Sequence, residues 1–289
     1  MSDAKTPDTA PTEARNPRTL DLDQLPPRSL LARILEEDAT VPAAVLGALP
    51  QLERASNALL ATLQGGGRWF NLGAGTSGRL GALDAAEIPP TYGLDPERVQ
   101  ALIAGGAKAL LRAVESAEDN AAAAARDLSA RNFSANDALL ALSASGQTPY
   151  ALAAVEFARE LGATTIGITC AAHSPLATAV DIAIAVEVGP EVVAGSTRMK
   201  GGLAQKMILH ALSTSVMVRL GLVRSNLMTG MRGFSCKLRE RAVRIVMELS
   251  ARSRPEATAA LEATDGNVEQ ALAHLEALAP AGPRTPRNR

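Results

Sequence analysis

The chain has 289 residues, a formal net charge of −1, 2% aromatic residues and two cysteines. This length allows one or two domains with a full core, while the charge and the few aromatic residues argue against a nucleic-acid-binding surface. Two cysteines without paired spacing argue against a disulfide framework or a thiolate zinc site. The N-terminus does not resemble a signal peptide, and no apolar run is long enough to span a bilayer. We therefore expect a cytoplasmic protein with no metal, no nucleic-acid partner and no membrane partner.

The N-terminal part is predicted to be a flexible segment followed by helices. Residues 1–18 are polar and contain prolines, which is typical of flexible segments. Residues 29–37 predict a short helix with Ser29 as its cap. Residues 41–63 carry apolar side chains at helical spacing, which predicts one amphipathic helix that ends at the glycines 65–67.

Strand-like apolar runs then alternate with helical segments. The predicted strands are residues 69–72, 99–103, 138–142, 165–169 and 182–188. A long helical insert, residues 107–130, separates the second strand from the third. Strands separated by helices indicate an α/β fold with a parallel sheet that helices cover on both faces.

The C-terminal part is predicted to be helical. Residues 196–220 form a long helix, residues 238–249 another, and residues 254–278 two short helices around Asp265, which together make a small helical bundle. The resulting division is a flexible N-terminal segment (1–18), a sheet domain with N-terminal helices (19–225), a helical C-terminal region (226–278) and a disordered tail (279–289).

A glycine-rich loop at residues 73–78 follows the first strand and begins a helix. Its glycines allow the backbone N–H groups to approach a ligand, the helix N-terminus favours an anion, and Thr76 and Ser77 add hydroxyl groups. The spacing also matches the dinucleotide fingerprint. However, the second strand ends in Ala104 and two glycines, without the acidic residue that a ribose requires.

A second hydroxyl-rich loop, residues 143–149, follows the third strand. Two such loops at the carboxyl ends of parallel strands form a crevice that suits one phosphate on a polyhydroxylated body. The alternative is a simple turn with a Ser/Thr helix cap. The residues 191–200 form a third segment, in which Ser196 or Thr197 caps the long helix. Arg198 and Lys200 then form either a wall for an anionic sugar or a surface cation pair.

Two carboxylates are candidate reagents. Glu87 lies between Ala86 and Ile88, an apolar setting that favours the protonated acid, and the two prolines that follow are expected to stop the helix. Glu118 lies in an acidic cluster with Glu115 and Asp119, and spacing alone does not choose among the three.

Together these motifs resemble the N-acetylmuramic acid 6-phosphate etherases of the sugar isomerase (SIS) fold superfamily, from about Thr12 to Leu278. The motifs that carry the resemblance are residues 12–16, 37–38, 66–68, 73–91, 103–106, 115–119, 143–150 and 191–200. It implies a SIS-type parallel sheet between helices, no cofactor, and a homodimer whose active site uses both chains. It assigns catalysis to Glu87 and to Glu118 rather than Glu115. We expect the sugar phosphate to contact Gly75, Thr76, Ser77, Ser143, Ser145, Thr148, Ser196 and Lys200.

The resemblance implies cleavage of a D-lactyl ether by elimination and hydration, with N-acetylglucosamine 6-phosphate and D-lactate as products. The chain departs from the family at Gln147, where arginine is usual, and at Gly230, where aspartate is usual. The related glucokinase regulatory protein shares the fold and binds sugar phosphate without this turnover, so a non-catalytic regulatory protein is the alternative. Retention of Glu87 and Glu118 favours the enzyme.

Overall fold

A computed structural model of the protein describes residues 11–232 and 236–278. Its contacts divide the chain into two compact units. Unit one holds the chain up to Ala86 together with Pro96–Val216, and unit two holds Glu87–Asp95 and the chain from Met217. The predicted tail and the first ten residues of the predicted flexible segment lie outside the described residues, and the four predicted domain boundaries remain predictions.

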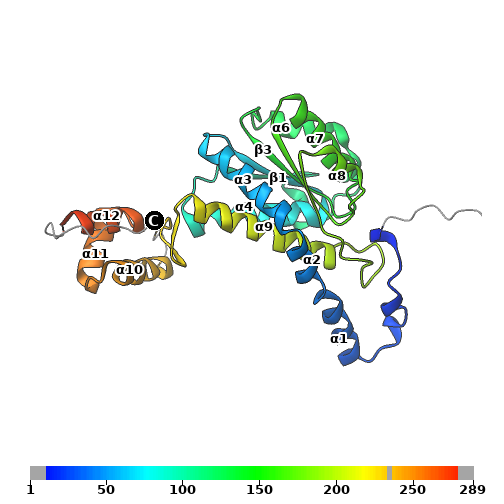
Figure 1. Ribbon diagram of the computed structural model, residues 1–289, viewed down its shortest axis with the longest axis horizontal. Helices are drawn as coiled ribbons and strands as arrows, with labels where there is room; N and C mark the ends of the chain where they lie inside the picture. The colour runs from blue at the N-terminus through cyan, green and yellow to red at the C-terminus, as the bar shows by residue number, and fades with distance from the viewer. Residues whose placement is uncertain (1–10, 233–235, 279–289) are drawn as a thin grey trace, which may run out of the picture. The chain divides into compact units, whose positions relative to one another are not determined.

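Unit one contains a parallel five-stranded sheet in the order β2-β1-β3-β4-β5 (Figure 1). The strands are β1 (Trp69–Gly73), β2 (Val99–Ile103), β3 (Ala138–Leu142), β4 (Thr164–Thr169) and β5 (Ile182–Ala185). Every residue of β1 and β3 is buried, as expected for central strands of a sheet covered on both faces. The predicted parallel sheet is therefore confirmed.

Helices lie on both faces of this sheet (Figure 1). The α-helices in chain order are α1 (Pro27–Asp38), α2 (Val41–Gly47), α3 (Leu49–Gln64), α4 (Gly75–Tyr92), α5 (Lys108–Leu111), α6 (Ala121–Ser129), α7 (Pro149–Glu160), α8 (Pro175–Ala179) and α9 (Lys200–Arg219). Short 3₁₀ turns are η1 (Pro11–Glu13), η2 (Pro17–Thr19), η3 (Leu22–Gln24) and η4 (Ala117–Asp119). The core between the sheet and α6 and α7 is built from Phe70, Leu72, Leu139 and alanines. Among the described residues, no helix has the length and apolar character needed to cross a membrane.

Two predicted helices are interrupted. The predicted helix over residues 41–63 is two helices, because Pro50 stands in the first turn of α3, where its missing N–H costs nothing, and would break a continuous helix. The predicted insert over residues 107–130 is also broken. Ser116 adopts φ of 58°, and Asn120 starts α6 afresh by accepting a hydrogen bond from the Ala123 amide at 3.2 Å.

The helix α4 extends beyond its predicted C-terminal end. It begins at Gly75, and it continues through Pro89 and Pro90, which were expected to stop it. A proline in a helix loses its own N–H and crowds the carbonyl four residues before it, but its fixed φ is near the helical value. The Gly93 amide still donates to the Pro89 carbonyl at 2.9 Å, which closes the last turn.

Residues 11–18 are held in place rather than loose. They form η1 and the start of η2, and both Thr12 and Asn16 are buried. The Asn16 side chain accepts a hydrogen bond from the Arg18 amide at 3.0 Å and so caps η2. The polar, proline-containing composition suggested flexibility because it does not show the partners that these residues meet elsewhere in the chain.

Unit two contains a short hairpin and a bundle of three helices. The hairpin pairs β6 (Val223–Arg224) with β7 (Leu227–Met228), and the bundle comprises α10 (Cys236–Ser250), α11 (Arg254–Ala263) and α12 (Val268–Leu278). A core of its own includes Met231, Val246, Leu261 and Leu272. The predicted helical C-terminal region is therefore confirmed.

Gly230, where the resemblance leads one to expect aspartate, is packed against the end of α4 within unit two. An added Cβ at Gly230 would lie 2.1 Å from the Tyr92 carbonyl oxygen. We expect Gly230→Ala to lower the free energy of unfolding by about 1–3 kcal/mol, because backbone has to move. Urea unfolding followed by circular dichroism measures this. Gly47→Ala, at a helical site where an added Cβ meets no described atom within 4 Å, is the control and should not destabilise; equal stability of the two variants would contradict the packing argument.

Candidate active site

The carboxyl ends of β1 and β3 lie side by side at the centre of the sheet, where Gly73 pairs with Leu142. From β1 the chain continues to β2 on one side, and from β3 it continues to β4 on the other. The loops after these two strands therefore diverge, which is the position where open parallel sheets bind ligands. Both hydroxyl-rich loops predicted from the sequence lie at this edge.

The first loop passes directly into α4. Gly75 has φ of 51°, and an added Cβ there would meet no described atom within 4 Å, so the backbone faces open space. Thr76 is half-buried and Ser77 is buried in the first turn. The N–H groups of this turn have no helical partner and can bind an anion.

The second loop is held by its own hydroxyl groups. The Ser143 and Thr148 hydroxyl oxygens lie 2.8 Å apart, and the Ser143 and Ser145 hydroxyl oxygens lie 3.4 Å apart. The Gly146 amide donates to the Ser143 hydroxyl at 3.0 Å. Thr148 precedes α7 but makes no side-chain cap bond to the described residues. A simple Ser/Thr helix cap is therefore not what this loop provides.

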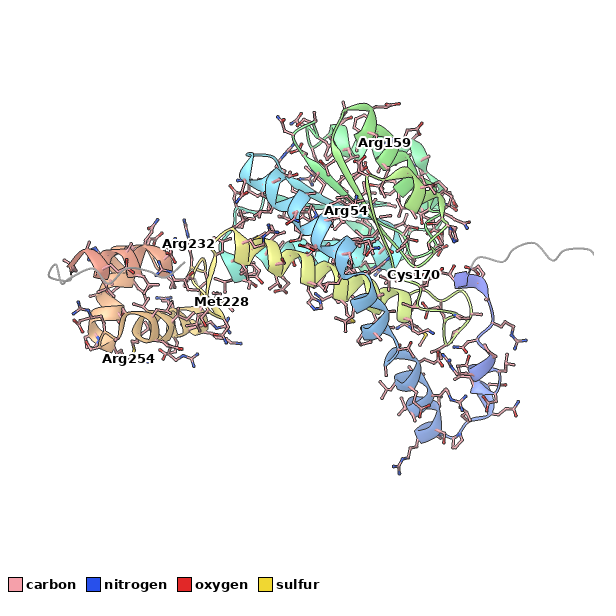
Figure 2. The ribbon with its side chains drawn as sticks, viewed as in Figure 1. Arg54, Arg159, Cys170, Met228, Arg232 and Arg254 are labelled. Atoms are coloured by element: carbon pink, nitrogen blue, oxygen red, sulfur yellow. The ribbon has the colours of Figure 1, made fainter. Side chains whose placement is uncertain are left out.

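The N-terminus of α9 lies beside both loops. An added Cβ at Gly202 would lie 3.4 Å from Cγ2 of Thr76, and one at Gly201 would lie 3.3 Å from the Ala144 Cβ and 3.6 Å from the Cys170 sulfur. Cys170, directly after β4, marks this edge of the sheet (Figure 2). The N-termini of α4, α7 and α9 therefore meet here. The dipoles of α4 and α7 favour a bound anion.

The sequence predicted that Ser196 or Thr197 caps α9. In the structure a carboxylate from an earlier part of the chain caps this helix instead. The helix begins at Lys200, after both residues. The Lys200 and Gly201 amides each donate to the Glu191 carboxylate at 2.8 Å. Burial raises the pKa of Glu191, while these two hydrogen bonds and the Lys200 charge oppose that rise. Ser196 lies half-buried in the segment before the helix.

The Lys200 ammonium group is paired with a carboxylate of the protein and is not free. Its side chain is 1% exposed, and its Nζ donates to the Glu37 carboxylate at 3.0 Å. The structure therefore does not present Lys200 to a ligand, in contrast to the predicted contact with the sugar phosphate. Arg198 remains exposed.

Helices α4 and α9 are also joined by a buried hydrogen bond. The Ser213 hydroxyl donates to the Asp84 carboxylate at 3.0 Å, and burial raises the pKa of Asp84. This contact fixes α4, whose first turn contains Thr76 and Ser77, against α9, which begins at Lys200. No local sequence pattern points to this role of Asp84, because its partner Ser213 is 129 residues away in the chain.

Neither candidate catalytic carboxylate is buried. Glu87 is exposed on α4, although its neighbour Ile88 is 2% exposed. The predicted apolar setting is therefore wrong, because successive helical residues point in directions about 100° apart. Glu118 is exposed on η4, as are Glu115 and Asp119. Because all three are exposed, burial does not distinguish among them. Of the three, Glu115 lines a hollow of about 800 Å³ beside β2.

Comparison with known proteins gives the relationship of the whole chain. A model of the SIS domain matches residues 112–215, and a model of the glucokinase regulatory protein N-terminal SIS domain matches residues 51–159. The N-acetylmuramic acid 6-phosphate etherase of Aeromonas hydrophila subsp. hydrophila is 50% identical over 261 residues, which cover 90% of this chain and 88% of that protein. N-acetylmuramic acid 6-phosphate etherase 2 of Vibrio cholerae is 48% identical over 265 residues, covering 91% and 86%.

This chain belongs to the N-acetylmuramic acid 6-phosphate etherase family. Two solved structures share its fold at lower identity. A ligand-bound protein from Escherichia coli CFT073 has a TM-score of 0.52 at 17% identity and covers 70% of this chain and 97% of its own. A phosphoheptose isomerase from Francisella tularensis has a TM-score of 0.52 at 20% identity and covers 67% and 100%. These two show the SIS-type fold alone.

The two positions at which this chain departs from the usual etherase sequence do not include Glu87 or Glu118. Gln147 is exposed in the second loop, where its backbone N–H donates to the Ser145 hydroxyl at 3.3 Å. Its side chain supplies no cation there, whereas an arginine would. Gly230 is packed against the Tyr92 carbonyl in unit two, so an aspartate would first require a backbone shift.

Proposed function

We propose that this protein cleaves the D-lactyl ether of N-acetylmuramic acid 6-phosphate and releases N-acetylglucosamine 6-phosphate and D-lactate. The observation that supports this most strongly is the 50% identity to an etherase over 90% of the chain. The convergence of the N-termini of α4 and α7 with two hydroxyl-rich loops supports a phosphate-bearing substrate. The proposed phosphate and sugar contacts are Gly75, Thr76, Ser77, Ser143, Ser145, Thr148 and Ser196.

The proposed reaction needs one acid and one base. In the ring-opened sugar the aldehyde makes the C2 proton acidic, and a carboxylate removes it. The C3–oxygen bond then breaks, and a carboxylic acid gives its proton to the departing lactate oxygen. Water adds at C3 of the resulting unsaturated aldehyde, and C2 regains a proton. We assign Glu87 as the acid for lactate departure and Glu118 to the C2 proton or to the activation of water.

We also propose that the protein is a cytoplasmic homodimer whose active site uses both chains. Exposed leucines on the N-terminal helices α1, α2 and α3 support a further protein contact, because large exposed apolar side chains mark interaction surfaces. They are Leu31, Leu35, Leu46 and Leu49, each at least 60% exposed. Sedimentation equilibrium that shows only a monomer at micromolar concentration would contradict this.

The deciding experiment is incubation with N-acetylmuramic acid 6-phosphate followed by an enzymatic assay of D-lactate. We expect stoichiometric D-lactate and N-acetylglucosamine 6-phosphate. N-acetylmuramic acid without the phosphate is the control, and it should react far more slowly because the proposed site binds through the phosphate. Saturable binding of the sugar phosphate without any lactate would favour the regulatory alternative.

A further inference from the structure

Two N-terminal motifs, residues 12–16 and 37–38, carry the family resemblance but have no part in the reaction proposed above. The first of them runs alongside the segment that leads into α9. The contacts are Gly195 amide to Thr12 carbonyl at 3.1 Å, Asn16 side-chain amide to Pro190 carbonyl at 3.2 Å, and Thr19 hydroxyl to Val192 carbonyl at 2.9 Å. We call residues 12–19 the N-terminal strap. It holds the segment of residues 190–195 at three points.

Glu37, from the second motif, joins this strap to α9. Its side chain is 3% exposed at the end of α1. It accepts hydrogen bonds from the Asn16 side-chain amide at 2.8 Å, from the Arg18 guanidinium at 2.8 Å and from the Lys200 ammonium at 3.0 Å. Arg18 above all, with Lys200 and Asn16, holds the pKa of Glu37 at about 2 although burial opposes this. The carboxylate is therefore ionised at neutral pH and fully paired, as a buried charge must be.

Lys200 is consequently fixed at both ends. Its backbone amide is bound by Glu191, and its ammonium is bound by Glu37. Lys200 is the first residue of α9, and the first turn of this helix lies beside Thr76 and Ala144 of the two ligand loops. The position of the third helix N-terminus at the sheet edge thus depends on a carboxylate that lies 163 residues away in sequence.

We propose that Glu37 is a positioning residue for the binding of the substrate phosphate. Through Lys200 and the N-terminal strap, Glu37 holds residues 190–199 and the first turn of α9 against the two ligand loops. Glu37 does not touch the substrate in this arrangement. Its effect is preorganisation, because an anion site that must be ordered on binding loses affinity. This proposal rests on the proposed function for the identity of the ligand. The binding experiment that tests it does not require the protein to turn over a substrate.

The test compares the binding of N-acetylglucosamine 6-phosphate, measured by calorimetry, in the wild type and in Glu37→Gln. We expect Kd to rise about tenfold or more. In turnover of the etherase substrate, KM should rise by a similar factor while kcat changes by less than about threefold, because a phosphate contact is made equally in the ground state and the transition state. The binding arm remains informative even when no lactate is released, so the two proposals fail separately.

The matched control is Asp137→Asn. Asp137 is also 3% exposed and paired with an arginine, Arg68, at 2.7 Å, but both residues precede their strands at the opposite edge of the sheet. This variant should lose thermal stability without a change in Kd. An equal loss of affinity in both variants, or a Kd within threefold of wild type in Glu37→Gln, would overturn the proposal.

Lys200→Met provides a second variant in case Glu37→Gln does not fold. It leaves Glu37 paired with Arg18 and Asn16 and should also weaken binding about tenfold. It further separates positioning from direct contact. If the Lys200 ammonium itself bound the phosphate, Glu37→Gln would release it and tighten binding, whereas positioning requires that both variants weaken it. Unchanged binding in Lys200→Met would contradict the proposal.

Discussion

Glu87→Gln is expected to bind N-acetylglucosamine 6-phosphate as the wild type does and to release D-lactate about 10³-fold more slowly. General acid catalysis by a positioned side chain contributes about 10²–10⁴-fold. The amide keeps the size of the carboxyl group but has no proton to give to the departing lactate oxygen. Because Glu87 is exposed on α4, the substitution should not disturb the core. Single-turnover release of D-lactate and calorimetric titration measure the two effects separately.

The matched control for this variant is Glu156→Gln, since Glu156 is likewise exposed, on α7. It should retain full activity. Lactate release by Glu87→Gln within tenfold of the wild-type rate would remove Glu87 from the role of acid. A parallel loss of sugar-phosphate binding would instead make Glu87 a binding residue.

The sheet and the ligand loops were predictable because their signals are local. A central parallel strand is a short apolar run, and the predicted strand over residues 138–142 has the observed bounds of β3. A loop that joins such a strand to a helix must lie at the carboxyl edge. The positions of the loops at residues 73–78 and 143–149 at this edge therefore followed from the predicted parallel strands that precede them.

The cap of α9 was not predictable from spacing. Ser196 and Thr197 form a standard cap signal before a helical segment. Glu191 competes with them successfully because a buried carboxylate accepts the amides of Lys200 and Gly201 together, and hydrogen bonds to a charged acceptor are the stronger ones. The partner of Lys200 lay even farther from any local pattern, since Glu37 is on another helix.

The environment of Glu87 was mispredicted for a geometric reason. Apolar neighbours in sequence suggested an apolar pocket, and two prolines suggested that the helix had ended. In the structure α4 continues to Tyr92, so Ile88 faces the interior while Glu87 faces outward. Within a helix, residues three and four positions apart share a face, and adjacent residues do not.

The second large effect concerns Glu118 and the fate of solvent atoms. If the reaction is an elimination followed by hydration, turnover in heavy water places deuterium at C2 of N-acetylglucosamine 6-phosphate. In oxygen-18 water the heavy oxygen enters at C3 of the sugar, because the C3–oxygen bond is the one that breaks. Direct attack on the lactyl carbon would instead put the label in lactate and leave C2 unexchanged. Mass spectrometry of both products distinguishes these outcomes.

Glu118→Gln is expected to slow deuterium incorporation at C2 by about 100-fold or more, since a base that removes the proton is lost. Glu115→Gln is the matched control, because Glu115 is also an exposed glutamate of the same acidic cluster. If Glu115→Gln were the variant with slow exchange, the assignment by family resemblance would be wrong. If Glu118→Gln exchanged C2 at the wild-type rate but formed little product, Glu118 would act in the later addition of water. Oxygen-18 in lactate would refute the elimination itself, whichever glutamate is the base.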